Sequence, residues 1–152
     1  MTGVPDFVPY RADADVIAIG IGLRERTLPR RRWTHEAHLT AAVWCLNSLG
    51  ESEALRTMPV LIRAYNEATG VPNTDTSGFH ETITTAFLRA ASASLSGQPD
   101  VPLFVACNQL ILSPVGKSDY LLSYWSRPCL FSVEARRRWV DADLKQFPFE
   151  GG

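Results

Sequence analysis

The residues best suited to chemistry in this chain are its three histidines, His35, His38 and His80. A neutral imidazole binds transition metals and also acts as a general base near neutral pH. His35 and His38 are three residues apart, so on a helix they occupy neighbouring positions. Together with a histidine from a second helix, such a pair forms a three-histidine site that leaves room for water or substrate. One divalent zinc, iron or copper ion would fit that site.

Two predicted helices carry these histidines. The range 35–49 follows the N-cap residue Thr34, has apolar residues at helical spacing and ends at Gly50. The range 79–95 has an apolar stripe centred near Ile83. At about 100° per residue, all three imidazoles lean toward the apolar faces of the two helices.

The remaining segments complete an all-α fold. Helices are expected over 12–26, 52–69 and, as a short pair, 118–126 and 133–140. Within the range 52–69, Pro59 predicts a kink in the helix or a later start of the helix. The apolar segment 102–112 is interpreted as a buried helix, with a strand as the alternative. Residues 1–11 form an extended lead-in and 141–152 an irregular tail. We therefore predict one domain spanning 1–152, an up-down bundle of four main helices plus short C-terminal helices.

The up-down arrangement predicts that the histidines meet. The second and fourth helices would run parallel, so His35, His38 and His80 would lie in first turns at the same end. The third helix would run back between them, which places Tyr65 and Asn66 of its last turn at that end too. Two helix N-termini directed into one pocket favour neutral imidazoles and a bound carboxylate or phosphate. An anionic small molecule is the expected ligand.

A structural role for the histidines is the alternative. His35 and His38 would then hydrogen-bond to loops at the helix start, and His80 would pair with Tyr65 or Asn66. Such a network stabilises the fold without any chemistry.

Composition excludes several classes of function. The chain has 152 residues and a net charge of −1, which argues against a general role on nucleic acid or anionic membranes. The arginine clusters at 30–32 and 136–138 are interpreted as solvated helix faces. The N-terminus has no secretory signal, so a cytoplasmic protein is expected. The three cysteines include no CxxC pair and are expected to be free thiols, at Cys45, Cys107 and Cys129.

The segment 124–139 combines aromatic residues with arginines. We expect it to fold over the histidine end as a lid, where Arg127 or Arg136 would donate hydrogen bonds to an anionic ligand. In the alternative, Trp125 and Trp139 cap the far end of the core.

Four motifs resemble those of a family of small, largely uncharacterised bacterial proteins. They are W-T-H-x-x-H-L at 33–39, Y-N-E-x-x-G at 65–70, G-F-H-E-T-I-T at 78–84 and S-R-P-x-L-F-S-V-E-A-R at 126–136. Phe79 and Trp125 stand where the family pattern has tyrosine. The resemblance implies no particular reaction, but it favours a functional histidine site. Trp33 and Thr84, which belong to the motifs, are candidate substrate-binding residues.

The sequence thus predicts a small bacterial enzyme that acts on an anionic metabolite, with or without one divalent metal. His35, His38 and His80 would be catalytic, with Tyr65 and Asn66 orienting the substrate. The alternative is a non-catalytic helical module that binds a ligand or a partner. The reaction class and the oligomeric state stay open.

Overall fold

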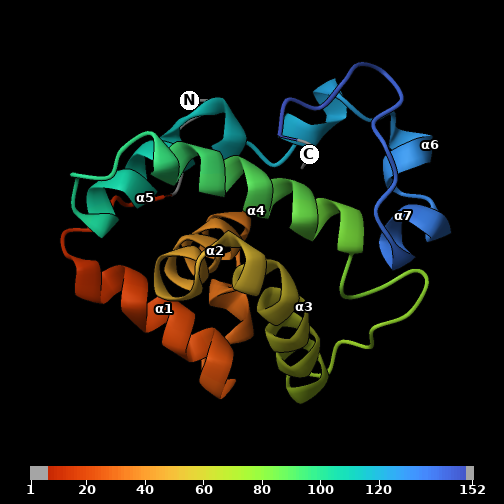
Figure 1. Cartoon of the computed structure of the whole chain (residues 1–152). Helices are drawn as coiled ribbons and strands as arrows, with labels where there is room; N and C mark the ends of the chain where they lie inside the picture. Colours follow the sequence, from red (N-terminus) through yellow and green to blue (C-terminus); the bar gives the residue numbers. More distant parts are fainter. Residues whose placement is uncertain (1–6, 150–152) are drawn as a thin grey trace, which may run out of the picture.

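The structure, a computed structural model, describes residues 7–149, and every regular element in this range is helical (Figure 1). The main helices are α1 (Asp13–Glu25), α2 (His35–Leu49), α3 (Glu51–Ala68), α4 (Glu81–Ser96) and α5 (Leu103–Leu112). Two short helices follow, α6 (Arg127–Leu130) and α7 (Val133–Arg137). Single 3-10 turns lie at Arg30–Arg32, Pro114–Gly116 and Tyr120–Ser123. The predicted all-α class is confirmed, and the segment 102–112 is a helix.

The two ends of the described range lack helical structure. Residues 7–12 precede α1, and residues 138–149 follow α7. The parts of the predicted lead-in and tail at 1–6 and 150–152 lie outside the described residues.

Helix α2 is the centre of the fold, because it packs against α1, α3, α4 and α5. Figure 1 views α2 nearly along its axis, whereas α4 runs across the view above it. A regular up-down bundle of four helices is therefore not confirmed. Helix α1 approaches α2 closely at Gly20, where an added Cβ would collide with the ring of Trp44.

Local chemistry sets the ends of α2 and α3. The Thr34 hydroxyl accepts a hydrogen bond from the Ala37 amide at 3.1 Å, which caps α2. Gly50 ends α2 at a φ of +81°, and α3 begins at the next residue. Pro59 lies inside the continuous helix α3, so it does not mark a later start as the sequence had suggested. Burial of one face of α3 offsets the backbone hydrogen bond that a proline removes.

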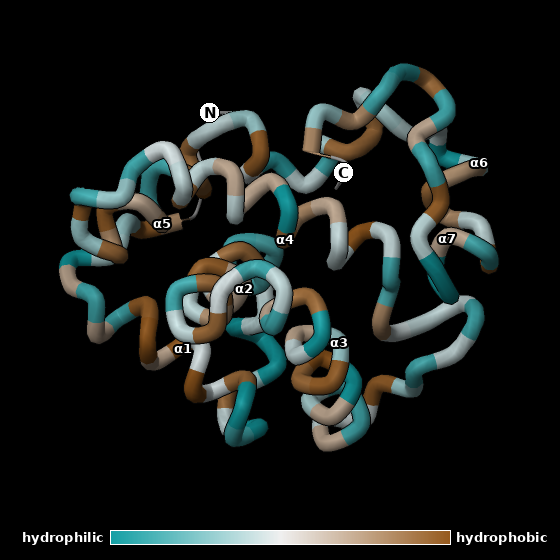
Figure 2. The backbone as a smooth tube through the Cα atoms, viewed as in Figure 1, coloured by the Kyte–Doolittle hydropathy of each residue, from teal (hydrophilic) through white to brown (hydrophobic). Residues whose placement is uncertain are grey.

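Helix α4 separates two clusters of buried apolar residues. The main core lies among α1 to α5, and apolar and polar residues alternate along α3 as expected for a helix with one buried face (Figure 2). On the other side of α4, Ala86 and Ala90 pack in a second cluster. Its other buried members come from the C-terminal segment: Leu121, Trp125, Leu130 and Phe147.

No helix within residues 7–149 combines the length and the apolar character needed to cross a bilayer. Cys45, Cys107 and Cys129 are free thiols, the first two buried.

Candidate functional site: two adjoining chambers

Two cavities lie where the N-terminal halves of α2 and α4 approach α3. The first, which we call the apolar chamber, has a volume of about 280 Å³. Buried aliphatic side chains dominate its wall, and its only polar lining residues are His35, His38 and Thr84.

The second cavity, which we call the polar chamber, has a volume of about 290 Å³. Its polar lining includes Arg30, Asn66, His80 and Arg136, and none of its lining residues is an aspartate or glutamate. The two chambers adjoin, because four residues line both: His38, Ile62, Ile83 and Thr84. Two of the three predicted histidines thus line each chamber, and His38 is common to both.

His38 is held in a defined orientation between the chambers. Its Nδ1 lies 2.9 Å from the carbonyl oxygen of Thr34, so Nδ1–H donates and Nε2 carries the lone pair of the neutral ring. The ring stacks on Trp33, with centroids 3.8 Å apart and planes inclined by 32°. Burial lowers the pKa of His38 to about 4, against the opposing effect of the Thr34 carbonyl. His38 is therefore neutral near pH 7.

His35 lines the apolar chamber and carries a buried polar atom without a partner. Its Nε2 is buried and has no hydrogen-bond partner among the described residues. The ring meets Phe87 edge to face at a centroid distance of 4.9 Å. Burial lowers the pKa of His35, while the Glu36 carboxylate acts in the opposite direction. Leaving a buried polar atom unsatisfied costs about 1–3 kcal/mol.

His80 has a different role from the one predicted. It is the N-cap of α4 in an extended conformation, with φ −132° and ψ 113°, and does not lie in the first turn. Its Nδ1 accepts from the Ile83 amide at 3.1 Å, and its Nε2 donates to the Leu130 carbonyl at 2.8 Å. The His80 ring therefore does not hydrogen-bond to Tyr65 or Asn66, the partners predicted for a structural role. Burial lowers the pKa of His80, against the effect of the Leu130 bond.

Within residues 7–149 the three histidines do not gather at one metal-binding position as predicted. With both ring nitrogens of His80 in hydrogen bonds, this side chain has no lone pair left for a metal. No group of three His, Cys, Asp or Glu side chains within residues 7–149 is arranged to hold a metal ion. The arrangement gives no support to zinc, iron or copper at His35, His38 and His80.

Two arginines supply the positive charge of the polar chamber. Arg30 donates from Nη1 to the side chains of Asn66 at 2.9 Å and Thr69 at 3.2 Å. Arg136 donates from Nη1 to the Gly78 carbonyl at 2.8 Å. In the described part of the chain neither arginine forms an ion pair with a carboxylate. Each guanidinium has five N–H donors, so both keep donors for a ligand.

Arg30 is exposed, as the interpretation of its cluster as a solvated face predicts, but it also contributes to the polar chamber. Its neighbours Arg31 and Arg32 line neither chamber, whereas Arg30 is held over the Tyr65 ring at 5.5 Å and lines the polar chamber.

The other predicted residues divide into three groups. Trp33, Asn66 and Thr84 line at least one chamber. Tyr65 lines neither, because it is fully buried and its hydroxyl donates to the Leu28 carbonyl at 2.7 Å. Arg127 also lines neither: it is the exposed first residue of the four-residue helix α6. The structure therefore gives no support to the predicted role of Arg127 at the site.

The C-terminal segment covers the polar chamber only in part. Leu130 accepts from His80, and Phe131 and Arg136 line the chamber. Figure 1 shows α7 near the beginning of α4. Trp125, in contrast, is fully buried in the second core cluster, where its Nε1 donates to the Val140 carbonyl at 3.0 Å.

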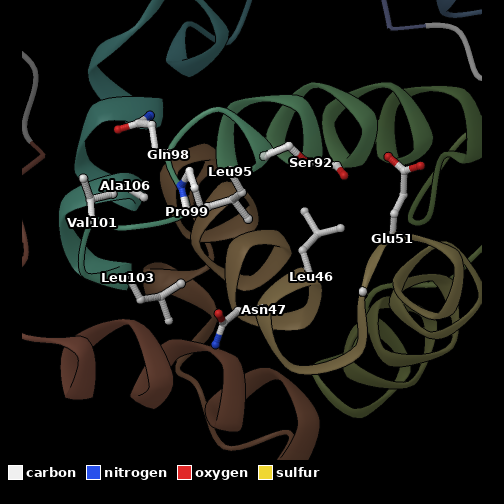
Figure 3. A pocket seen from close by; sticks show the side chains of 12 residues that line it. Leu46, Asn47, Glu51, Ser92, Leu95, Gln98, Pro99, Val101, Leu103 and Ala106 are labelled. Atoms are coloured by element: carbon white, nitrogen blue, oxygen red, sulfur yellow. The ribbon is translucent and has the colours of Figure 1, made fainter.

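A larger hollow of about 440 Å³ lies near the opposite ends of α2 and α4 (Figure 3). Leu46, Leu95 and Leu103 are among its lining residues, and Glu51 is the only charged one. Because it offers neither a histidine nor a cation, it lacks the chemistry of the two chambers.

Comparison of the chain with known protein families, with curated proteins and with solved structures finds no match.

Proposed function

We propose that this protein binds a small anionic metabolite, whose negative group enters the polar chamber. The observation that carries the proposal is the pair Arg30 and Arg136 at one cavity that no carboxylate of residues 7–149 lines. The chain as a whole has a net charge of −1, so this positive site is a local arrangement and does not reflect the overall composition. A carboxylate or phosphate would accept the unused guanidinium donors and relieve the repulsion between the two cations.

The chemistry of His38 favours binding over catalysis as the basic function. An imidazole whose pKa is about 4 is neutral at pH 7 but is a weak base, since an efficient general base has a pKa near the working pH. His38 is therefore uncharged in the free protein, and it offers an uncharged hydrogen-bonding group to an anion that enters the polar chamber.

A small enzyme that uses acid–base chemistry is the second candidate. It is favoured by the Thr34 carbonyl, which fixes the tautomer whose Nε2 can accept a proton. An anion bound nearby would raise the pKa of His38 toward its ordinary value of 6.5 and make it a better base. Measuring this pKa by NMR with and without a bound carboxylate tests the candidate. An unchanged value near 4 would argue against catalysis by His38.

The binding proposal is tested by titrating inorganic phosphate and sodium butyrate into the protein, with affinities measured by calorimetry or NMR. Wild type should bind at least one of them. Arg30→Gln and Arg136→Gln should each weaken binding by roughly ten- to a hundred-fold, the equivalent of a lost charge-assisted hydrogen bond.

Two matched variants control for a general loss of positive charge. Arg31 is exposed and lines neither chamber, and Arg138 is exposed and pairs with Glu134. Arg31→Gln and Arg138→Gln should keep wild-type affinity. The proposal fails if wild type binds neither anion, or if the control variants lose as much affinity as the chamber variants.

A further inference from the structure

The two chambers adjoin in a way that suits one elongated ligand. His38 and Thr84 line both cavities and lie at their common boundary. On one side of this boundary are the two arginines, and on the other the lining is almost entirely apolar. A molecule that extends from the polar chamber into the apolar chamber contacts the two arginines at one end and apolar side chains at the other.

The apolar chamber reaches into the main core. Among its wall residues, Leu39, Met58 and Leu88 are each at most 2% exposed. Its volume of about 280 Å³ corresponds to roughly nine groups of the size of a water molecule, at about 30 Å³ each. Water molecules find few hydrogen-bond partners in this chamber, whereas transfer of a hydrocarbon chain from water into it is favourable.

The imidazole of His35 adds a polar group to this otherwise apolar wall. Burying a charged group in this chamber would be costly, because no cation among the described residues lines it. An uncharged group such as a hydroxyl, keto or amide group can instead hydrogen-bond to a ring nitrogen of the neutral imidazole.

From these observations we infer that the ligand is a small amphiphilic acid. Its anionic group binds at Arg30 and Arg136, its apolar chain passes His38 and Thr84, and an uncharged polar group on the chain meets His35. This inference rests on the proposed function and narrows its ligand to one chemical class.

The chain-length dependence of affinity tests the inference on the wild-type protein. Butyrate, hexanoate and octanoate are titrated by calorimetry at concentrations where they are monomeric. At about 0.8 kcal/mol for each buried methylene, each step of two methylenes should strengthen binding about fifteen-fold until the chamber is filled. Ala42→Leu, which inserts carbon into the chamber, should abolish this gain.

The polar group is tested with the ω-hydroxy acids of the same three lengths. At one of these lengths, wild type should bind the ω-hydroxy acid as tightly as the plain acid of the same length. In His35→Leu, the same hydroxy acid should bind at least five-fold more weakly than its plain acid, because the hydroxyl loses its partner.

The outcomes separate the inference from the function on which it rests. If butyrate, hexanoate and octanoate bind equally well, the amphiphile inference is overturned while anion binding in the polar chamber stands. If affinity grows with chain length, the ratio of affinities between hydroxy acid and plain acid in His35→Leu tests the contact with His35. A ratio equal to that of wild type overturns this contact. If wild type binds neither phosphate nor butyrate, the proposed function itself is wrong.

Discussion

Filling the apolar chamber should stabilise the protein. Ala42 lies on α2, is 3% exposed and lines this chamber. Ala42→Leu adds three carbons, which need roughly 90 Å³ at about 30 Å³ each, well within the volume of the chamber. Their transfer from water contributes about 2.4 kcal/mol at about 0.8 kcal/mol per carbon. Ordering the leucine side chain costs about 0.5–1 kcal/mol, so the expected net gain in free energy of unfolding is about 1.5–2 kcal/mol.

The neighbouring residue on the same helix provides the control. Ala41 is fully buried and lines neither chamber, so Ala41→Leu should overpack the core and lower the free energy of unfolding by about 1–3 kcal/mol. Urea denaturation of the two variants and wild type, followed by circular dichroism, measures both effects. If Ala42→Leu destabilises the protein as much as Ala41→Leu does, the space assigned to the apolar chamber is filled by protein, and the reasoning is refuted.

Three further predictions concern the histidines and the close packing of α1. His80→Ala should lower the free energy of unfolding by about 1–3 kcal/mol in urea denaturation, because it removes the α4 cap and a buried hydrogen bond; His80→Asn should recover part of the loss. The pKa of His38 is lower when folded than the ordinary 6.5, so the unfolded chain takes up the proton first as pH falls. This contribution of His38 to the free energy of unfolding is complete above pH 6.5 and is lost toward pH 4, by about 2 kcal/mol between pH 7 and pH 5. In His38→Gln the loss on acidification should be smaller by that amount, because only His35 and His80, whose pKa values are also lowered, remain. Gly20→Ala should lower the melting temperature through its collision with Trp44, whereas Gly97→Ala, which meets no close neighbour, should not.

Each of these predictions has a contradicting result. An unchanged stability of His80→Ala would mean that its two hydrogen bonds are not structural. Equal losses of stability on acidification in wild type and His38→Gln would mean that His38 titrates normally in the folded protein. A wild-type melting temperature for Gly20→Ala would contradict the close approach of α1 to α2.

Helix α2 could be predicted from sequence because its signals are local. Thr34, the N-cap, and Gly50, the C-cap, lie directly before and after the apolar repeat of this helix. The predicted range 35–49 is the observed one. The placement of His35 and His38 in the first turn followed directly from this.

His80 was misplaced because its role depends on a distant partner. Imidazole is not among the common N-cap side chains, so no local signal indicates that α4 begins after His80. The second bond of the ring is to Leu130, 50 residues away, in a short helix whose position no local pattern predicts.

Arg30 was missed for a similar reason. Three consecutive arginines are typical of a solvated surface, and nothing in the cluster distinguishes the first from the others. What distinguishes Arg30 is Asn66, 36 residues further along the chain, which accepts from its guanidinium and lines the same chamber. A long-range hydrogen bond of this kind is set by the packing of the helices and has no signature in spacing.

The central claim is that Arg30 and Arg136 together bind an anion, and a crystal structure of the protein grown with sodium hexanoate tests it most directly. The carboxylate should lie within hydrogen-bond distance of both guanidinium groups, with the hydrocarbon chain passing His38 into the apolar chamber. Hexanoate bound elsewhere, with both arginines free of it, would contradict the claim.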